Sequence, residues 1–225
     1  MLVNPGLLLQ NANPRDVLAS AKAALVGFTP NYYWDFINND AIVNGVVLGG
    51  VMKTPGITGT PRFSTEGLYV DAIGDMLTIP LTPPSNPFTI YVEFNRIVDT
   101  GAPARTITWD DGTANNLYAL GVTSTDLGNS QVTTATVSQA AVNSVALWPL
   151  TPPKKLASRF DTNDVTMSFS GAATIQDNLA TMPTGITTLR FGGSTSGGSL
   201  ANGYIRRVAI FNSGLTNPNL VTITT

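Results

Sequence analysis

Two polar loops place carboxylates at a spacing that could bind a metal ion or a sugar. Trp109-Asp110-Asp111-Gly112-Thr113 sets two carboxylates beside an indole ring, and Asp161-Thr162-Asn163-Asp164 sets two carboxylates beside an amide. Such oxygens are ligands of Ca²⁺, but the same residue types form β-turns through their own side-chain hydrogen bonds. We therefore predict turns and no cofactor, with Ca²⁺ as the alternative. The candidate calcium ligands are Asp110, Asp111, Asp161 and Asp164.

Aromatic rings beside polar side chains could bind a sugar by stacking on its pyranose ring. An aromatic ring also buries a large apolar area, so each such residue is alternatively a core or interface residue. The adjacent Arg206 and Arg207 could contact an acidic glycan, or could pair with aspartates on neighbouring strands. The candidate glycan-binding residues are Trp109, Asp110, Asp111, Tyr118, Tyr204 and Arg206, with Trp148 as a further aromatic candidate.

The chain lacks the residues on which several catalytic mechanisms depend. It contains no histidine and no cysteine, which excludes a Ser-His-Asp triad, a thiol nucleophile and a disulfide framework. Glycoside hydrolysis needs two carboxylates about 5–9.5 Å apart, whereas the only glutamates, Glu66 and Glu93, are far apart in the sequence. We predict that the protein is not an enzyme. Aspartates brought together by folding would make it a glycan hydrolase instead.

The charge content indicates a bland surface. Only 12% of the residues are charged, against roughly 25% in an average globular protein, so Ser, Thr, Asn and Gly must keep the chain soluble. The net charge of −2 gives no electrostatic basis for binding nucleic acid. No apolar run approaches the ~20 residues of a membrane span. The start, MLVNPGLLLQ, lacks a basic region and a cleavage site, so we expect no signal peptide.

One helix is predicted near the start of the chain. Asn13 and Pro14 form an N-cap and first-turn pair, apolar residues follow at helical spacing, and Gly27 ends the run. We assign residues 1–30 to an arm for attachment or oligomerisation; alternatively, the helix covers an open end of the following domain. The arm residues singled out for attachment are Asn13, Pro14, Val17, Leu18 and Leu25.

Residues 31–225 show strand patterns and turn signals every 8–12 residues or so, which is typical of an all-β sandwich. The strongest strand is 88–98, in which Phe88, Ile90, Val92 and Phe94 share one face. Residues 67–71 and 75–81 are expected to form a hairpin. In the last strand, 203–211, strict alternation places Ile205, Arg207, Ala209 and Phe211 on one face and Tyr204, Arg206, Val208 and Ile210 on the other.

Several motifs, taken in order, resemble one family. They are the closing Gly203-Tyr204-Ile205 strand, the preceding Leu189-Arg190-Phe191-Gly192-Gly193, and the hairpin that joins residues 156–161 to 164–171. Together they resemble the laminin-G-like, concanavalin A-type jelly rolls. The lack of histidine and cysteine, the Thr-, Asn- and Gly-rich composition and the N-terminal arm are similar to those of bacteriophage structural proteins. The resemblance implies an antiparallel two-sheet jelly-roll sandwich behind a short helical arm.

The same resemblance implies a function. It suggests a non-enzymatic virion protein, such as a tail-fibre, head-fibre or decoration subunit, made in the bacterial cytoplasm and carried on the particle. Its expected partners are other virion proteins, further copies of itself and a host-surface glycan. The first alternative is a secreted bacterial carbohydrate-binding module, and the second is a glycan hydrolase on the same fold, because one fold hosts many functions.

Overall fold

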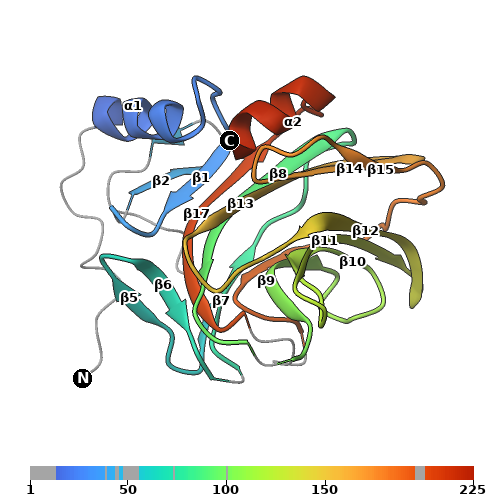
Figure 1. The fold of residues 1–225 in the computed structure, drawn as a ribbon, viewed down its shortest axis with the longest axis horizontal. Helices are drawn as coiled ribbons and strands as arrows, with labels where there is room; N and C mark the ends of the chain where they lie inside the picture. Colours follow the sequence, from blue (N-terminus) through green and yellow to red (C-terminus); the bar gives the residue numbers. More distant parts are fainter. Residues whose placement is uncertain are drawn as a thin grey trace.

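The computed structural model describes residues 14–38, 40–43, 46–47, 56–72, 74–99, 101–195 and 201–225. Within these residues the strands form a 10-stranded and a 7-stranded antiparallel sheet. The two sheets face each other around a shared apolar core, and helices lie on the outside of the larger sheet (Figure 1). The predicted fold class, an antiparallel two-sheet jelly-roll sandwich with a short N-terminal helix, is confirmed.

The larger sheet holds the last strand at its centre, with a hairpin attached at one end of that strand. Its spatial order is β15 (Ile175–Asp177), β14 (Asp164–Phe169), β13 (Lys154–Asp161), β8 (Phe88–Arg96), β17 (Gly203–Phe211), β1 (Tyr32–Asp35), β2 (Asp40–Val43) and β3 (Val46–Val47). The attached hairpin is β5 (Arg62–Ser64) and β6 (Gly67–Val70), and β6 pairs with β17.

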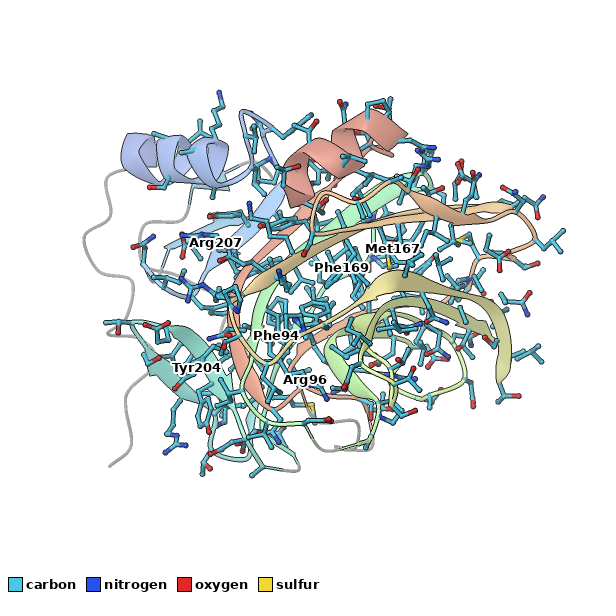
Figure 2. All side chains as sticks on the ribbon, in the orientation of Figure 1. Phe94, Arg96, Met167, Phe169, Tyr204 and Arg207 are labelled. Carbon is cyan, nitrogen blue, oxygen red and sulfur yellow. The ribbon has the colours of Figure 1, made fainter. Side chains whose placement is uncertain are left out.

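The smaller sheet covers the inner face of the larger one. Its spatial order is β12 (Val137–Leu147), β11 (Leu127–Thr134), β10 (Leu117–Val122), β9 (Ala104–Asp110), β16 (Thr188–Phe191), β7 (Met76–Pro80) and β4 (Gly56–Thr58). Strand β8 shows how the core is built, because Phe88, Ile90, Val92 and Phe94 all point inward and are fully buried, as predicted. Phe94, Met167 and Phe169 fill the space between the sheets (Figure 2).

One predicted hairpin is wrong, and one observed hairpin has no glycine in its turn. Residues 67–71 and 75–81 do not form a hairpin, because β6 belongs to the larger sheet and β7 to the smaller one. The buried Asp75 shapes this crossover by accepting hydrogen bonds from the backbone N–H groups of Thr60 (2.6 Å) and Ala72 (3.2 Å). A hairpin without a glycine joins β11 to β12, where Ala135 and Thr136 both take positive φ angles of 49° and 71°.

Helices cover one half of the outer face of the larger sheet. Helix α1 (Pro14–Ala24) starts at the predicted residue, while its predicted N-cap, Asn13, lies outside the described residues. Ala21 and Leu25 are fully buried in a cluster with Tyr33, Tyr91 and other residues on the outside of the sheet. Val17 lies within α1 and Leu18 packs against the same cluster. This packing is that of a covering helix, and the attachment role of residues 1–30 stays a prediction.

The sequence analysis predicts a single helix, and this number is wrong. A second helix, α2 (Asn217–Thr224), follows β17. Its β-branched residues have modest helix propensity, but Leu220 and Ile223 are fully buried in the outer cluster. Thr224 adds contacts to the sheet, since its hydroxyl lies 2.9 Å from that of Ser168 and accepts a hydrogen bond from the N–H of Gly171. Tertiary packing therefore overrides local preference in this segment. Among the described residues no helix has both the length and the apolarity to cross a bilayer.

Candidate functional site

The outer face of the larger sheet changes character along β8 and β17. At one end Tyr91 and Phe211 are buried beneath α1 and α2. At the other end Tyr204 is only partly buried and lies beside β5 and β6, away from the helices. Figure 2 shows Arg207 nearer the helices and Tyr204 nearer the β5–β6 hairpin. Among the described residues no helix covers this second end, so it is the part of the face that a ligand could reach.

A β-bulge in β17 sets the direction of its side chains. Ile205 pairs with Phe94 and Arg207 pairs with Glu93, so Arg206 is an extra residue without a partner on β8. The alternation predicted across 203–211 is consequently wrong beyond the bulge. Val208 and Ile210 lie in the core between the sheets with Ile205, whereas Arg207, Ala209 and Phe211 lie on the outer side.

Gly67 allows a neighbouring strand to approach this bulge. Its φ of +127° lies in the region that favours glycine, and a Cβ placed there would lie 2.5 Å from the backbone oxygen of Ile205. With glycine at this position, β6 can pair with the end of β17. Tyr69 is thereby brought directly opposite Tyr204.

Next to the helices lies a buried ion cluster of Asp35, Glu93 and Arg207. The Arg207 guanidinium donates from Nε to Oδ2 of Asp35 (3.2 Å) and from Nη1 to Oε2 of Glu93 (2.7 Å). Asp35 also accepts from the Tyr33 hydroxyl at 3.2 Å. Burial alone would lower the pKa of Arg207, but the charges of Glu93 and Asp35 outweigh it and raise that pKa. Burial raises the pKa of Tyr33, and Asp35 adds to the effect. Each carboxylate of the cluster is thus in direct contact with the Arg207 guanidinium, which suits a structural role.

Beyond this cluster a row of polar and aromatic side chains crosses four strands. Arg62 of β5 lies opposite Tyr69 of β6, Tyr69 opposite Tyr204 of β17, and Tyr204 opposite Asn95 of β8. The tyrosine ring centroids are 4.7 Å apart with an interplanar angle of 33°, and the Arg62 guanidinium carbon lies 4.7 Å from the Tyr69 centroid. We call Arg62, Tyr69, Tyr204 and Arg206 the Tyr–Arg surface. Its aromatic groups are half-buried and its guanidinium groups stand at its rim.

Both arginines of the Tyr–Arg surface are already paired. Arg62 binds Asp71 at 2.6 Å, and Arg206 binds Glu66 at 3.0 Å and Glu93 at 2.9 Å. The Glu66 side chain is 57% exposed, so this pair is on the solvent side. Slight burial and then the charge of Asp71 raise the pKa of Tyr69. Its hydroxyl, like that of any tyrosine with a pKa of about 10 or higher, is protonated at neutral pH. The surface thus offers aromatic rings and hydroxyl groups with little excess charge.

The other predicted aromatic candidates lie in the core, so their assignment as sugar-stacking residues is wrong. Trp109 is fully buried and its indole N–H donates to the backbone oxygen of Leu81 at 2.7 Å. Tyr118 packs edge-on against Phe88 at 5.1 Å, and burial raises its pKa to about 12. Trp148 is also buried between the sheets. The alternative, that these rings stabilise the interior, is the correct one.

The carboxylates predicted as sugar or calcium ligands have protein partners. Asp110 is fully buried and binds Arg190 of β16 at 2.7 Å and 3.3 Å, so it is not accessible to a sugar. Asp111 accepts from the N–H and hydroxyl of Thr113 at 2.8 Å and 2.6 Å. These are turn contacts of the kind the sequence predicts.

The second acidic loop is also a turn. Asp161 accepts from the N–H of Thr162 at 2.8 Å, and Asp164 binds Arg159 at 2.7 Å. Burial would raise the pKa of Asp164, but hydrogen bonds from Arg159 and Thr166 outweigh it and lower that pKa. In the described part of the chain no group of three or more acidic side chains is arranged to hold a metal ion.

The sequence prediction therefore found part of the candidate site. Tyr204 and Arg206 belong to the Tyr–Arg surface, whereas Arg62, Tyr69 and Asn95 were not identified as site residues. The available signal was the alternation in 67–70, which places Tyr69 opposite in direction to the buried Leu68 and Val70. The alternative that these arginines pair with aspartates of neighbouring strands holds for Arg207, which binds Asp35 of β1. It does not hold for Arg206, whose two partners, Glu66 and Glu93, are glutamates.

Comparison with known proteins supports the architecture. No family model matches the chain, and no curated protein matches it. Among solved structures, the NanB sialidase from Streptococcus pneumoniae aligns with a TM-score of 0.56 and 16% identity over 69% of this chain and 27% of that chain. A Trypanosoma rangeli sialidase in complex with sialic acid aligns with a TM-score of 0.55 and 12% identity over 76% and 29%.

A smaller neighbour is the CBM40 of a Ruminococcus gnavus sialidase bound to α2,3-sialyllactose. It aligns with a TM-score of 0.49 and 13% identity over 65% of this chain and 95% of that chain. The two larger matches establish a likeness of fold, namely the jelly-roll sandwich.

Proposed function

We propose that this protein is a non-enzymatic carbohydrate-binding jelly roll that recognises glycan through the Tyr–Arg surface. The observation that supports this is the stack formed by Arg62, Tyr69 and Tyr204 on the open half of the outer sheet face. Tyrosine combines an apolar ring with a polar hydroxyl group, which suits a contact that is partly wet. Tyrosine and arginine are also the residue types that dominate binding energy in many interfaces.

The charge balance of the surface suggests the class of glycan. Because Arg62 is paired with Asp71 and Arg206 with two glutamates, neither arginine is free to neutralise a ligand carboxylate. We therefore propose that ring stacking and hydroxyl hydrogen bonds supply the affinity, and that a neutral saccharide binds at least as well as its sialylated form.

Binding without catalysis is part of the same proposal. The buried carboxylates Asp35, Glu93 and Asp110 are each paired with an arginine. A carboxylate held in this way directs oxygen atoms toward a guanidinium of the same protein, so we do not expect it to act on a bound glycan. The proposal expects no release of reducing ends when the protein is incubated with a glycan that it binds.

For the biological context of this binding we retain the two possibilities predicted from the sequence. Carbohydrate binding is the reading that agrees with the neighbouring structures, whereas the bacteriophage virion role and particle localisation rest on the low charge content and the sequence resemblance. We retain the virion appendage and the secreted bacterial module as the two settings. Genes for terminase, portal or tail proteins beside this gene would identify the first.

A glycan array followed by calorimetry tests the proposal. Tyr204→Ala should weaken binding about tenfold or more, as expected for loss of a central aromatic contact, whereas Tyr204→Phe keeps the ring and should retain most of the affinity. Thr222→Ala, on the exposed side of α2, serves as the control. Lactose and α2,3-sialyllactose should be compared directly. Unchanged binding by Tyr204→Ala would reject the site, and reducing ends that disappear with a carboxylate substitution would reject the non-enzymatic assignment.

A further inference from the structure

Strand β12 is a long, exposed edge of the smaller sheet. Its 11 residues, Val137–Leu147, pair with β11 on one side, and β12 is the terminal strand of the sheet order. In Figure 1 it lies at the end of the sandwich opposite to α1 and the β5–β6 hairpin. An edge strand presents unpaired N–H and C=O groups that can template another strand.

The side chains of this edge are apolar and strongly exposed. Val145 is 90% exposed, Leu147 is 63% and Val137 is 58%. Among the described residues, four of the eight exposed large apolar side chains lie between positions 137 and 150. The buried residues of β12, such as Val142, point inward, so these exposed side chains are additional to the core.

The whole region around β12 is uncharged. No Asp, Glu, Lys or Arg occurs between Asp126 and Lys154, a stretch that contains both β11 and β12. Natural proteins commonly protect an edge strand with charged residues, with proline, with β-bulges or by making it very short. Strand β12 contains neither proline nor charge. Only the register shifts in its pairing with β11, at Leu127/Asn129 and Val132/Thr133, interrupt its regularity.

The other edge strands of the two sheets are protected by being very short. In the described part of the chain, the terminal strands β3, β4, β5 and β15 have only two or three residues each. Strand β12 is thus the one long edge strand among them. An edge of the same length and neutrality that could pair with it is the β12 edge of a second copy. A charged partner would have to lose hydration against this apolar strip without gaining an opposite charge.

We propose that two copies of this chain associate through β12, antiparallel and related by a two-fold axis. Such an isologous contact lets each strand supply donors and acceptors to the other, so that the two smaller sheets become continuous. The axis passes through the regular segment 140–143, which pairs without a register shift against residues 129–132 of β11. With the axis at Ala141, which is exposed, the Ala141 side chains of the two copies face each other. The Tyr–Arg surface lies on the other sheet and stays open in both copies.

Sedimentation velocity or light scattering across about a hundredfold dilution measures this association. The wild-type protein should show twice the 23.6 kDa mass of the chain. Ala141→Lys should be monomeric, because the two-fold axis brings the like charges of the two copies together. An equimolar mixture of Ala141→Lys and Ala141→Glu should form the dimer again. Ile57→Lys, on β4 at the opposite edge of the same sheet, should leave it intact.

Hydrogen exchange separates strand pairing from other modes of association. Alternate amides of β12 should be protected in the concentrated protein and exposed on dilution, while those of β4 should not change. Circular dichroism confirms that each variant is folded. A monomeric wild-type protein, a dimer that survives Ala141→Lys, or a dimer without concentration-dependent protection of β12 would overturn the proposal.

Discussion

Arg206 and Arg207 are adjacent in sequence, but the structure predicts very different consequences for their removal. Arg207 binds two buried carboxylates, of which the Asp35 side chain is only 2% exposed. Arg207→Met leaves the Asp35 charge without a cation, although Asp35 keeps hydrogen bonds from Tyr33, from the N–H of Ile37, and from the N–H and side chain of Asn38. Removing one partner of a buried ion pair costs about 3–5 kcal/mol. The remaining donors place the expected loss near the lower end.

Arg206→Met is the matched control. Glu93 keeps its 2.7 Å contact with Arg207, and the lost partner Glu66 is solvent-exposed. An exposed ion pair contributes about 0–1 kcal/mol. For a chain of this size 1 kcal/mol corresponds to about 2–4 °C in Tm, so we expect a decrease of about 6–12 °C for Arg207→Met and about 4 °C or less for Arg206→Met.

Thermal and urea unfolding, followed by circular dichroism, give both values. The double-mutant cycle with Asp35→Asn should then show a coupling energy with Arg207→Met and none with Arg206→Met. Equal losses for the two arginines, or a larger loss for Arg206→Met, would refute the assignment of the bulge and of the buried ion cluster.

Three further outcomes follow from single contacts. Asp110→Asn leaves Arg190 without its carboxylate and should reduce the free energy of unfolding by about 3 kcal/mol in urea denaturation. Gly121→Ala would place a Cβ 2.0 Å from the backbone oxygen of Ala104, so overpacking should cost about 1–3 kcal/mol or more in the same assay. Burial raises the pKa of Tyr118 to about 12, above about 10 for an unfolded tyrosine. The neutral side chain therefore contributes fully to stability below pH ~10, and this contribution declines up to pH ~12. Tyr118→Phe should reduce that decline in denaturation measured against pH.

Local patterns were sufficient to predict the sandwich and its central strand. The alternation in β8 is regular because every inward residue meets the opposite sheet, and the turn at Asp161–Asp164 is made by the short polar side chains that favour turns. The sequence alone could not show whether Trp109 and Tyr118 are buried or exposed, because the same residue types suit a core and a sugar site. That choice depends on which strand lies opposite.

The bulge in β17 could not be predicted from local sequence. Residues 203–211 alternate without a glycine or proline in their interior, and the interruption depends on Glu93 and on the close approach of Gly67 from another strand. The hairpin at Ala135 and Thr136 lacks the Asn-Gly signal that would mark a two-residue turn in the sequence. Tyr69 was missed for a related reason, since its neighbour Tyr204 lies far along the chain.

The β5–β6 hairpin divides its residues between two tasks. Leu68 and Val70 point into the core and anchor it, whereas Arg62 and Tyr69 point outward and form half of the Tyr–Arg surface. Under the proposed function, substitutions confined to the outward positions would change the contacts to a glycan and leave the two core side chains in place. The hairpin is therefore a segment in which ligand preference can change without loss of the core.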